Sequence, residues 1–311
     1  MATQRTSIIR GPGSLKFGDV TFYDADGITA EVNTDTQEVQ SSISGQLDTI
    51  KTDQTAVIGF TPCGQFDADI LAALFPHQTP SIGSSLCGVA DKALLVHSLA
   101  GQKVEFVNAV LTGIPELRLS PVATVFGPAQ FTALLGLGKA PGDENAFYKL
   151  ATAAYNLGYP DPEGLTGVHY VGTFGSLSIP DTADGWTVNV ELATEPVKTD
   201  SQGTIDFTLS GVTVRAKCTP LGLTESQILS KLPVTSARGA SLRGSDDLVI
   251  AGAGGLTVTL KNATIVTGPL QWGNTTLRAG EIGFVAHRSF SQGAAGALYS
   301  VALTASDETD D

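Results

Sequence analysis

Residues 183–192 read ADGWTVNVEL, a turn pair followed by strict alternation of apolar and polar residues. Trp186, Val188 and Val190 fall on one face of an extended chain, and the residues between them fall on the other. A period of two is typical of a β-strand with one buried face. This stretch therefore predicts a strand that belongs to a half-buried antiparallel sheet.

The same stretch has a relative 158 residues earlier in the chain. Residues 25–74 and 183–232 align without a gap, and sixteen of the fifty positions are identical. A repeated supersecondary unit usually packs against its own copies, so we look for function first in assembly. In the first copy the identical residues, which fall on turns and on the apolar face, are Ala25, Asp26, Gly27, Thr29, Val32, Thr36, Val39, Gly45, Asp48, Thr55, Thr61, Pro62, Gly64, Ile70, Leu71 and Leu74.

Length and composition agree with a division into two domains. The chain has 311 residues, 35 of them Gly, one Met and only 16% charged residues. Such a chain is long enough for about two domains of roughly 150 residues. We predict a mainly β protein with two tandem β-sandwich or half-barrel domains, 1–158 and 159–311, each flanked by one short α-helix.

Turn signals and polar stretches outline each copy. Asp26-Gly27 and Asp184-Gly185 predict hairpin turns. Polar segments follow at 33–45 and 193–203 and are expected to be loops. A Gly inside a strand, as at Gly211, indicates a bulge.

The two expected helices follow the strand pairs. Ile70, Leu71 and Leu74 form an apolar stripe after Asp67, and residues 224–232 repeat it with a capping box at Thr224. Residues 144–157 have helical spacing when taken alone, but their likeness to 297–305 favours a closing strand. Residues 158–162 are then the linker, and the acidic residues 307–311 are expected to be a disordered tail.

No constellation of residues indicates catalysis, a metal or a cofactor. The four His are scattered, and the three Cys are odd in number and do not repeat, which fits small buried apolar residues better than disulfides. Gly252–Gly255 precedes a strand and not a phosphate-binding helix, so a hairpin turn is favoured. We also expect no secretory signal and no membrane span. An enzyme is the least supported class.

The charge of the chain bears on its partners. A net charge of −13 argues against binding nucleic acid by neutralising its phosphates. The acids form either a solvated outer face or a surface that faces a polyanion without holding it. They include Glu31, Glu38, Asp48, Asp53, Glu191, Glu195 and Asp206.

The order of elements resembles the tail tube protein of long-tailed bacteriophages. The likeness covers both halves and includes Gly45, Leu47 and Asp48, which are repeated as Gly203, Ile205 and Asp206. The resemblance implies a β-sandwich flanked by a helix, with six domains in a ring and rings stacked into a conduit for DNA. Two domains in one chain imply a ring of three chains, and a ring of six chains with the second domain outside is the alternative.

The resemblance also implies partners and surfaces. The chain would bind itself within and between rings, and it would also bind tape measure, terminator and baseplate proteins. The tail would be part of the virion and would be made in the bacterial cytoplasm. DNA would pass through the lumen, and no membrane or cofactor would be involved. The loop 33–45 would contact the next ring through Asp35, Thr36, Gln37, Glu38 and Gln40. The acids expected to line the lumen are Glu31, Asp48, Asp53, Glu191 and Asp206.

Two other functions are open at this point. A baseplate hub or distal tail adaptor would use the same fold but stop at one ring. A carbohydrate-binding β-sandwich would expose aromatic side chains in a groove, for which the chain has Trp186 and Trp272. Trp186 lies on the predicted apolar face, which weakens the second alternative.

Overall fold

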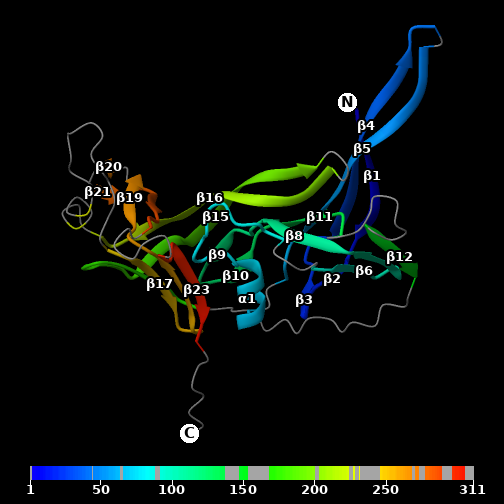
Figure 1. Ribbon diagram of the computed structural model, residues 1–311. Coiled ribbons are helices and arrows are strands. Elements are labelled where there is room, and N and C mark those ends of the chain that lie inside the picture. Colours follow the sequence, from blue (N-terminus) through cyan, green and yellow to red (C-terminus); the bar gives the residue numbers. More distant parts are fainter. Residues whose placement is uncertain are drawn as a thin grey trace.

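The structure is a computed structural model of the chain. It describes residues 2–43, 45–63, 66–87, 92–136, 147–152, 168–199, 203–223, 227, 231, 246–267, 270–272, 277–288 and 296–304. We call the part up to residue 152 the first half and the part from residue 168 the second half. The prediction of a mainly β protein is confirmed, because strands dominate both halves and the described residues contain one short helix (Figure 1).

Two antiparallel sheets make up most of the first half. We call one the back sheet of this half and the other its arm sheet, since the latter carries a long projecting hairpin. The back sheet has the order β3 (Val20–Tyr23), β2 (Gly13–Phe17), β6 (Leu94–Ser98), β7 (Gln102–Phe106) and β12 (Tyr148–Thr152). The arm sheet has the order β1 (Ala2–Gly11), β4 (Ile28–Ser41), β5 (Gly45–Phe60), β11 (Ala129–Leu134) and β8 (Asn108–Gly113).

The second half has a back sheet and an arm sheet of its own. Its back sheet has the order β14 (Leu177–Ile179), β13 (Tyr170–Phe174), β17 (Leu248–Gly252), β18 (Leu256–Leu260) and β23 (Tyr299–Leu303). Its arm sheet has the order β10 (Thr124–Phe126), β9 (Leu117–Leu119), β15 (Asp181–Thr199), β16 (Gly203–Leu221), β22 (Ile282–Val285) and β19 (Thr264–Thr267). Strands β20 (Leu270–Trp272) and β21 (Leu277–Ala279) form a separate hairpin.

Apolar side chains fill the space between arm sheet and back sheet in each half. In the first half, Phe17 and Phe22 of the back sheet pack on Phe131 of the arm sheet, with ring centroids 4.8 and 6.4 Å apart. In the second half, Phe174 packs edge to face on Phe284 at 5.4 Å. Tilted and edge-on rings are the favoured aromatic geometries, and their burial is the main source of stability in such a sandwich.

The two halves have the same strand order. Each back sheet has five strands in one order, and each arm sheet has the same five, counting β9 in the place of β1. The register also matches at an offset of 158, because Val32 pairs with Ala56 while Val190 pairs with Val214. The closing strand favoured at 144–157 is confirmed as β12, and its counterpart in the second half is β23.

Irregularities recur at matching places too. The β4–β5 pair shifts register after Asp35 and again after Val39, and the β15–β16 pair shifts after Ala193 and after Val197. Both shifts in the second half lie 158 residues after the corresponding shifts in the first half. The bulge expected at Gly211 is confirmed, since Gly211 pairs with Ala193 at this shift. A bulge raises the local twist of a strand, so both arms leave their sheets in the same manner.

The two Asp-Gly pairs do not form hairpin turns, so that prediction is wrong. Strands β3 and β4 belong to different sheets, and Gly27, with φ of 105°, connects them. Gly185, with φ of 80°, lies inside β15, where pairing with β16 is interrupted between Thr182 and Trp186. Glycine suits both places because a positive φ is costly for other residues. Asp26-Gly27 thus joins a back-sheet strand to an arm-sheet strand, whereas Asp184-Gly185 lies at a break in pairing within an arm-sheet strand.

The first predicted helix is confirmed. Helix α1 (Ala68–Leu74) begins after Asp67, whose Oδ1 accepts a hydrogen bond of 2.7 Å from the Ile70 N–H, and it buries Ile70, Leu71 and Leu74. Such an N-cap satisfies one of the free N–H groups of the first turn. The second predicted helix, at 224–232, lies mostly outside the described residues, as do the linker 158–162 and the tail 307–311.

A close contact between glycine and tryptophan fixes the packing of the second half. A Cβ on Gly172 would lie 2.1 Å from Cζ2 of Trp186, which is buried. We expect Gly172→Ala to lower the free energy of unfolding by about 1–3 kcal/mol through overpacking. Chemical denaturation followed by Trp fluorescence measures this change. Gly211→Ala is the matched control, because its Cβ meets only Ala193 at 3.5 Å, and a loss equal to that of Gly172→Ala would contradict the assignment.

Candidate assembly surfaces

Residues 33–41 and 193–199 of the two polar segments lie in paired strands and not in loops, so the expected loops are corrected to arms. In the first half β4 and β5 stay paired out to Ser41 and Gly45, and in the second half β15 and β16 stay paired out to Thr199 and Gly203. We call residues 36–51 arm 1 and residues 194–209 arm 2. A hairpin can satisfy its backbone hydrogen bonds without help from side chains, which is why polar residues do not prevent pairing here.

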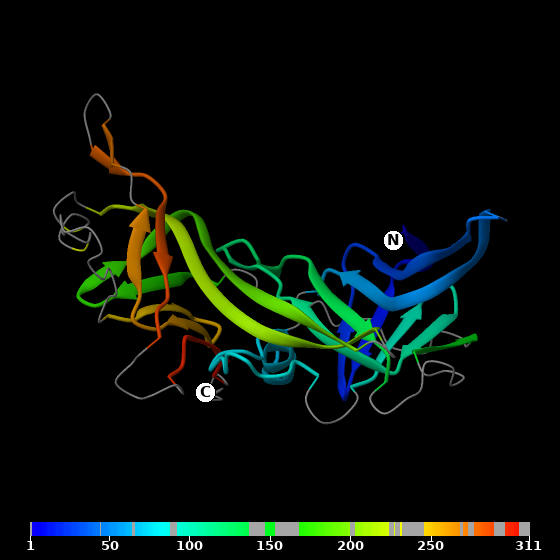
Figure 2. The same cartoon turned by 45° about the horizontal axis from the view of Figure 1, so that its top comes forward.

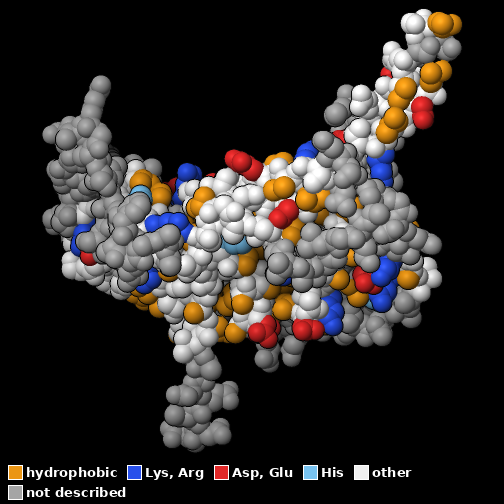
Figure 3. Space-filling view, in the orientation of Figure 1, with side chains coloured by type: hydrophobic (Ala, Val, Ile, Leu, Met, Phe, Trp, Pro, Cys, Tyr) orange, Lys and Arg blue, Asp and Glu red, His pale blue; other side chains and the backbone are white. Residues whose placement is uncertain are grey.

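Arm 1 projects away from the body of the molecule (Figure 1). Its apolar side chains are open to solvent, with Ile43 94% exposed, Leu47 61% and Ile50 52% (Figure 3). Patches of this kind on a soluble protein usually mark a contact with another molecule. The residues expected to contact the next ring all lie on β4, within arm 1 or at its base: Asp35, Thr36, Gln37, Glu38 and Gln40.

Arm 2 lies across the first half, as Figure 2 shows. The Leu209 N–H donates to the Ser84 carbonyl at 3.0 Å, and the Leu86 N–H donates to the Phe207 carbonyl at 2.8 Å. Leu209 is fully buried, and Phe207 packs against a small apolar cluster of the first half that contains Cys87. The two arms have the same register, but arm 2 buries Leu209 and packs Phe207 within the chain, while its Val197 is 37% exposed.

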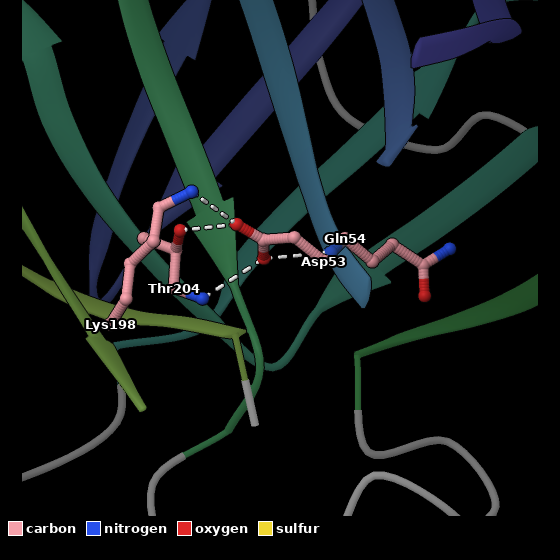
Figure 4. Close-up of polar contacts among 4 residues, drawn as sticks. All are labelled: Asp53, Gln54, Lys198 and Thr204. Atoms are coloured by element: carbon pink, nitrogen blue, oxygen red, sulfur yellow. Dashed lines mark hydrogen bonds and ion pairs between the residues drawn. The ribbon is translucent and has the colours of Figure 1, made fainter. Parts of the chain in front are cut away.

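Asp53 joins the two halves at the tip of arm 2 (Figure 4). Its carboxylate accepts hydrogen bonds from the N–H of Thr204 at 2.9 Å and the hydroxyl of Thr204 at 2.6 Å, and Nζ of Lys198 lies 3.0 Å away. Burial raises the pKa of Asp53, but the bonds from Thr204 and Lys198 outweigh it, and the pKa is lowered. Hydrogen bonds to a charged group are among the stronger polar contacts. Asp53 is therefore a structural link and not a free acid.

Asp206 forms a second link between the halves. Its Oδ1 accepts hydrogen bonds from the Cys87 N–H at 3.1 Å and the Phe207 N–H at 2.6 Å. Burial raises the pKa of Asp206, but the hydrogen bonds from Ser85, Cys87 and Phe207 have the larger effect. The pKa is therefore lowered. Asp206, like Asp53, was expected to face a lumen, and both carboxylates are instead occupied by contacts between the halves.

A hairpin of the first half completes a sheet of the second. Strand β9 pairs with β15, so that Leu117 faces Val188 and Leu119 faces Trp186, and β10 pairs with β9. Leu117 and Leu119 are fully buried. The predicted boundary at 158 falls in a stretch outside the described residues, but the sheets themselves cross it, since residues 117–126 of the first half belong to the arm sheet of the second.

Glu31 and Glu191 lie on the arm sheets, on the faces that point away from the cores. Glu31 stands between the buried residues Ala30 and Val32, and Glu191 follows the buried Val190. The Glu191 carboxylate accepts a hydrogen bond of 3.0 Å from the side chain of Asn189. Asp48 is exposed on arm 1, where its carboxylate accepts from the N–H of Thr49. These three acids remain candidates for a surface that faces DNA.

Basic side chains on the same face of the second arm sheet are mostly paired with acids. Arg118 Nε lies 2.6 Å from Glu116, and Lys217 Nζ lies 3.3 Å from Glu281. Glu116, Lys217 and Glu281 line an open hollow of about 550 Å³, together with Arg215 and Glu191. A paired cation attracts phosphate less than a free one, so this face is close to neutral and has little hold on a polyanion.

The structure also shows where the cysteines and Trp186 lie. All three Cys are free; Cys87 and Cys218 are buried, as expected, but Cys63 is only partly buried. Trp186 is buried, so it is no exposed platform for a sugar. Within the described residues, no three His, Cys, Asp or Glu side chains gather as a metal site requires, and no helix has the length and apolarity to cross a membrane.

Sequence reasoning missed the partners of the two linking aspartates. Thr204, Lys198 and Ser85 carry no motif, and they meet Asp53 or Asp206 only after the two halves pack together. The sole signal was the recurrence of Asp48 as Asp206, which marked the position but not its role. Compared with protein-family models and with curated proteins, the chain has no match, so its function must be inferred from its own geometry.

Proposed function

We propose that this protein is a structural subunit of a phage tail tube, which closes into rings that stack into a conduit for DNA. The observation that carries the proposal is the difference between two arms of equal register. Arm 2 buries Leu209 and packs Phe207 against the first half of the same chain, although Val197 is 37% exposed. Arm 1 leaves Ile43, Leu47 and Ile50 between 52% and 94% exposed. In the assembled ring, arm 1 would bind the second half of another copy as arm 2 binds the first half of its own chain.

A contact of this kind joins two different surfaces of the same subunit. Such head-to-tail contacts close into a ring when the rotation permits, and otherwise continue as a filament. The resemblance to tail tube proteins favours a ring of three chains, in which six similar units alternate between contacts within a chain and contacts between chains. Stacking of rings would then use the remaining surface of arm 1, which carries Gln37, Glu38 and Gln40.

The outward faces of the arm sheets suit the lumen of such a tube. Glu31 and Glu191 supply negative charge there, and Lys217 and Arg118 are paired with acids. DNA carries about one charge per 1.7 Å of its axis, so a lumen rich in free cations would bind it at many points. A lumen that is neutral to acidic lets DNA slide.

Electron microscopy of the purified protein tests this proposal. We expect rings and long hollow tubes of uniform diameter, since the contact surfaces are present in every subunit. Single rings that never elongate would instead favour a baseplate hub or distal tail adaptor. A solution of monomers at all concentrations would contradict both functions.

The charge of the proposed lumen gives a further test. We expect Glu31→Lys with Glu191→Lys to leave tube assembly intact but to slow DNA ejection severalfold, because the new cations would bind phosphates. Ejection is followed by the release of a DNA-binding dye from purified phage, at several salt concentrations, since salt screens these contacts. Glu105→Lys on β7 of the back sheet is the matched control, and an equal delay with that variant would remove Glu31 and Glu191 from the lumen.

A further inference from the structure

A second hairpin of the chain has the same place in its half as β9–β10. The hairpin β9–β10 is inserted between β8 and β11 of the first half, and β20–β21 is inserted between β19 and β22 of the second. The flanking strands correspond, since β8 and β11 pair as β19 and β22 do, with a bulge at the same point. The two hairpins are therefore equivalent elements.

The pairing within the hairpins also corresponds. Strand β10 ends three residues before Ala129, the first residue of β11, and β21 ends three residues before Ile282, the first of β22. Counting back from there, Arg118 of β9 corresponds to Gln271 of β20, because each faces the central residue of its partner strand. Leu270 and Trp272 then correspond to Leu117 and Leu119, which are fully buried against β15.

The two hairpins differ in what they pair with. Strand β9 is hydrogen-bonded both to β10 and to β15. Strand β20 is bonded to β21 alone among the described residues, in a two-stranded sheet. An isolated two-stranded hairpin is marginally stable in water, and an apolar one exposes a ready edge for pairing. The second hairpin thus has the sequence and the form of an added strand, and β20 has no acceptor strand in the part of the chain that the structure describes.

The acceptor that corresponds to β15 is β4 of the first half. In β15, Thr187 faces Arg118, and the equivalent residue of β4, Thr29, faces Arg10 of β1. Strand β1 therefore occupies on β4 the place, direction and register that β9 occupies on β15. The first-half edge is covered by the start of its own chain, and the matching edge of the second half is covered by a hairpin from the neighbouring unit.

We propose that, in the assembled ring, β20 of one subunit adds to β4 of the next and displaces β1 from that edge. The proposal rests on the ring-forming function and specifies the strand pairing that joins neighbouring subunits. Trp272 would face Ile28, Gln271 would face Thr29 and Leu270 would face Ala30. The hairpin and the β4 edge lie toward opposite ends of the molecule, as a head-to-tail contact requires (Figures 1 and 2). In the free subunit β1 guards the edge against uncontrolled pairing.

Paired cysteines test this joint directly. Residues facing each other in an antiparallel pair have Cα atoms about 4.5–5.5 Å apart, which a disulfide can bridge. In a Cys63→Ser background, we expect Thr29→Cys with Gln271→Cys to give covalent dimers and trimers on oxidation of assembled tubes. The single variants should give none. Arg118→Cys with Thr187→Cys is the positive control, because this equivalent pair closes within one chain.

Strand β1 provides a second readout. Arg10→Cys with Thr29→Cys should close within the free subunit and lose at least ten-fold in yield once tubes have formed. Tubes that form without the Thr29–Gln271 crosslink would overturn the strand exchange and leave the tube function intact. If the unmodified protein forms neither rings nor tubes, the tube function fails and the exchange fails with it.

Discussion

Replacing Leu47 and Ile50 with Asp is expected to abolish rings and tubes while leaving a folded monomer. Both side chains are more than half exposed on arm 1, so the monomer loses little when they become polar. In an assembled ring they would be buried, and a buried unpaired carboxylate costs several kcal/mol. Two such groups in every subunit should weaken the contact by more than a hundred-fold. Sedimentation velocity and electron microscopy measure the loss.

Leu150→Asp is the matched control for that pair of variants. Leu150 is 63% exposed, close to the 61% of Leu47, but it lies on β12 at the edge of the first back sheet. It should assemble normally if arm 1 is the contact surface. Shortening arm 1 symmetrically, by replacing residues 38–49 with Asn-Gly between the paired Gln37 and Ile50, should also prevent assembly. Tubes of normal length from the shortened protein would refute the contact.

The second large effect is expected from Asp53→Ala, which removes the link between the halves. The buried Thr204 would lose the acceptor of its N–H and hydroxyl, and Lys198 would lose its ion pair. A buried group left without its partner costs about 1–3 kcal/mol. We expect that loss in the free energy of unfolding, measured by chemical denaturation. Asp48→Ala, on the same strand but exposed, should change stability by less than 0.5 kcal/mol, roughly the usual range for surface substitutions.

The stabilisation from Asp53 should also depend on pH. Its folded pKa is lowered from the ordinary 3.8, so its contribution is fully present above that value and is lost as the pH falls through the folded pKa. The pKa of Asp206 is lowered in the same sense. Stability measured from pH 7 down to about pH 2 should therefore fall below about pH 4. The fall should be smaller in Asp53→Asn, and an equal fall in both proteins would contradict the link.

Local patterns predicted the strands well. The alternation around Trp186, the apolar stripe of Ile70, Leu71 and Leu74, and the bulge at Gly211 each depend on neighbours within a few residues. The likeness of residues 144–157 to 297–305 also identified β12 as a strand where its own spacing favoured a helix. Local propensity and the repeat together were sufficient for these elements of the fold.

Contacts between distant residues were not predictable from the same patterns. Polar composition at 33–45 favoured a loop, but a hairpin needs only cross-strand pairing, which composition does not report. Asp53 and Asp206 appeared as surface acids because Thr204 and Cys87 are far from them in sequence. The membership of β9 in a sheet of the other half was equally invisible, since a three-residue strand has no pattern of its own.

The passage of residues 117–126 into the sheet of the second half has a consequence for dilution. One of the two kinds of joint in the proposed ring is closed inside a single chain, where its partners meet at high effective concentration whatever the amount of protein. The other kind forms between molecules and follows mass action. Lowering the protein concentration should therefore break only the contacts between chains, which are every second contact around the ring. Each released chain would keep its internal contact, and assembly can restart from it.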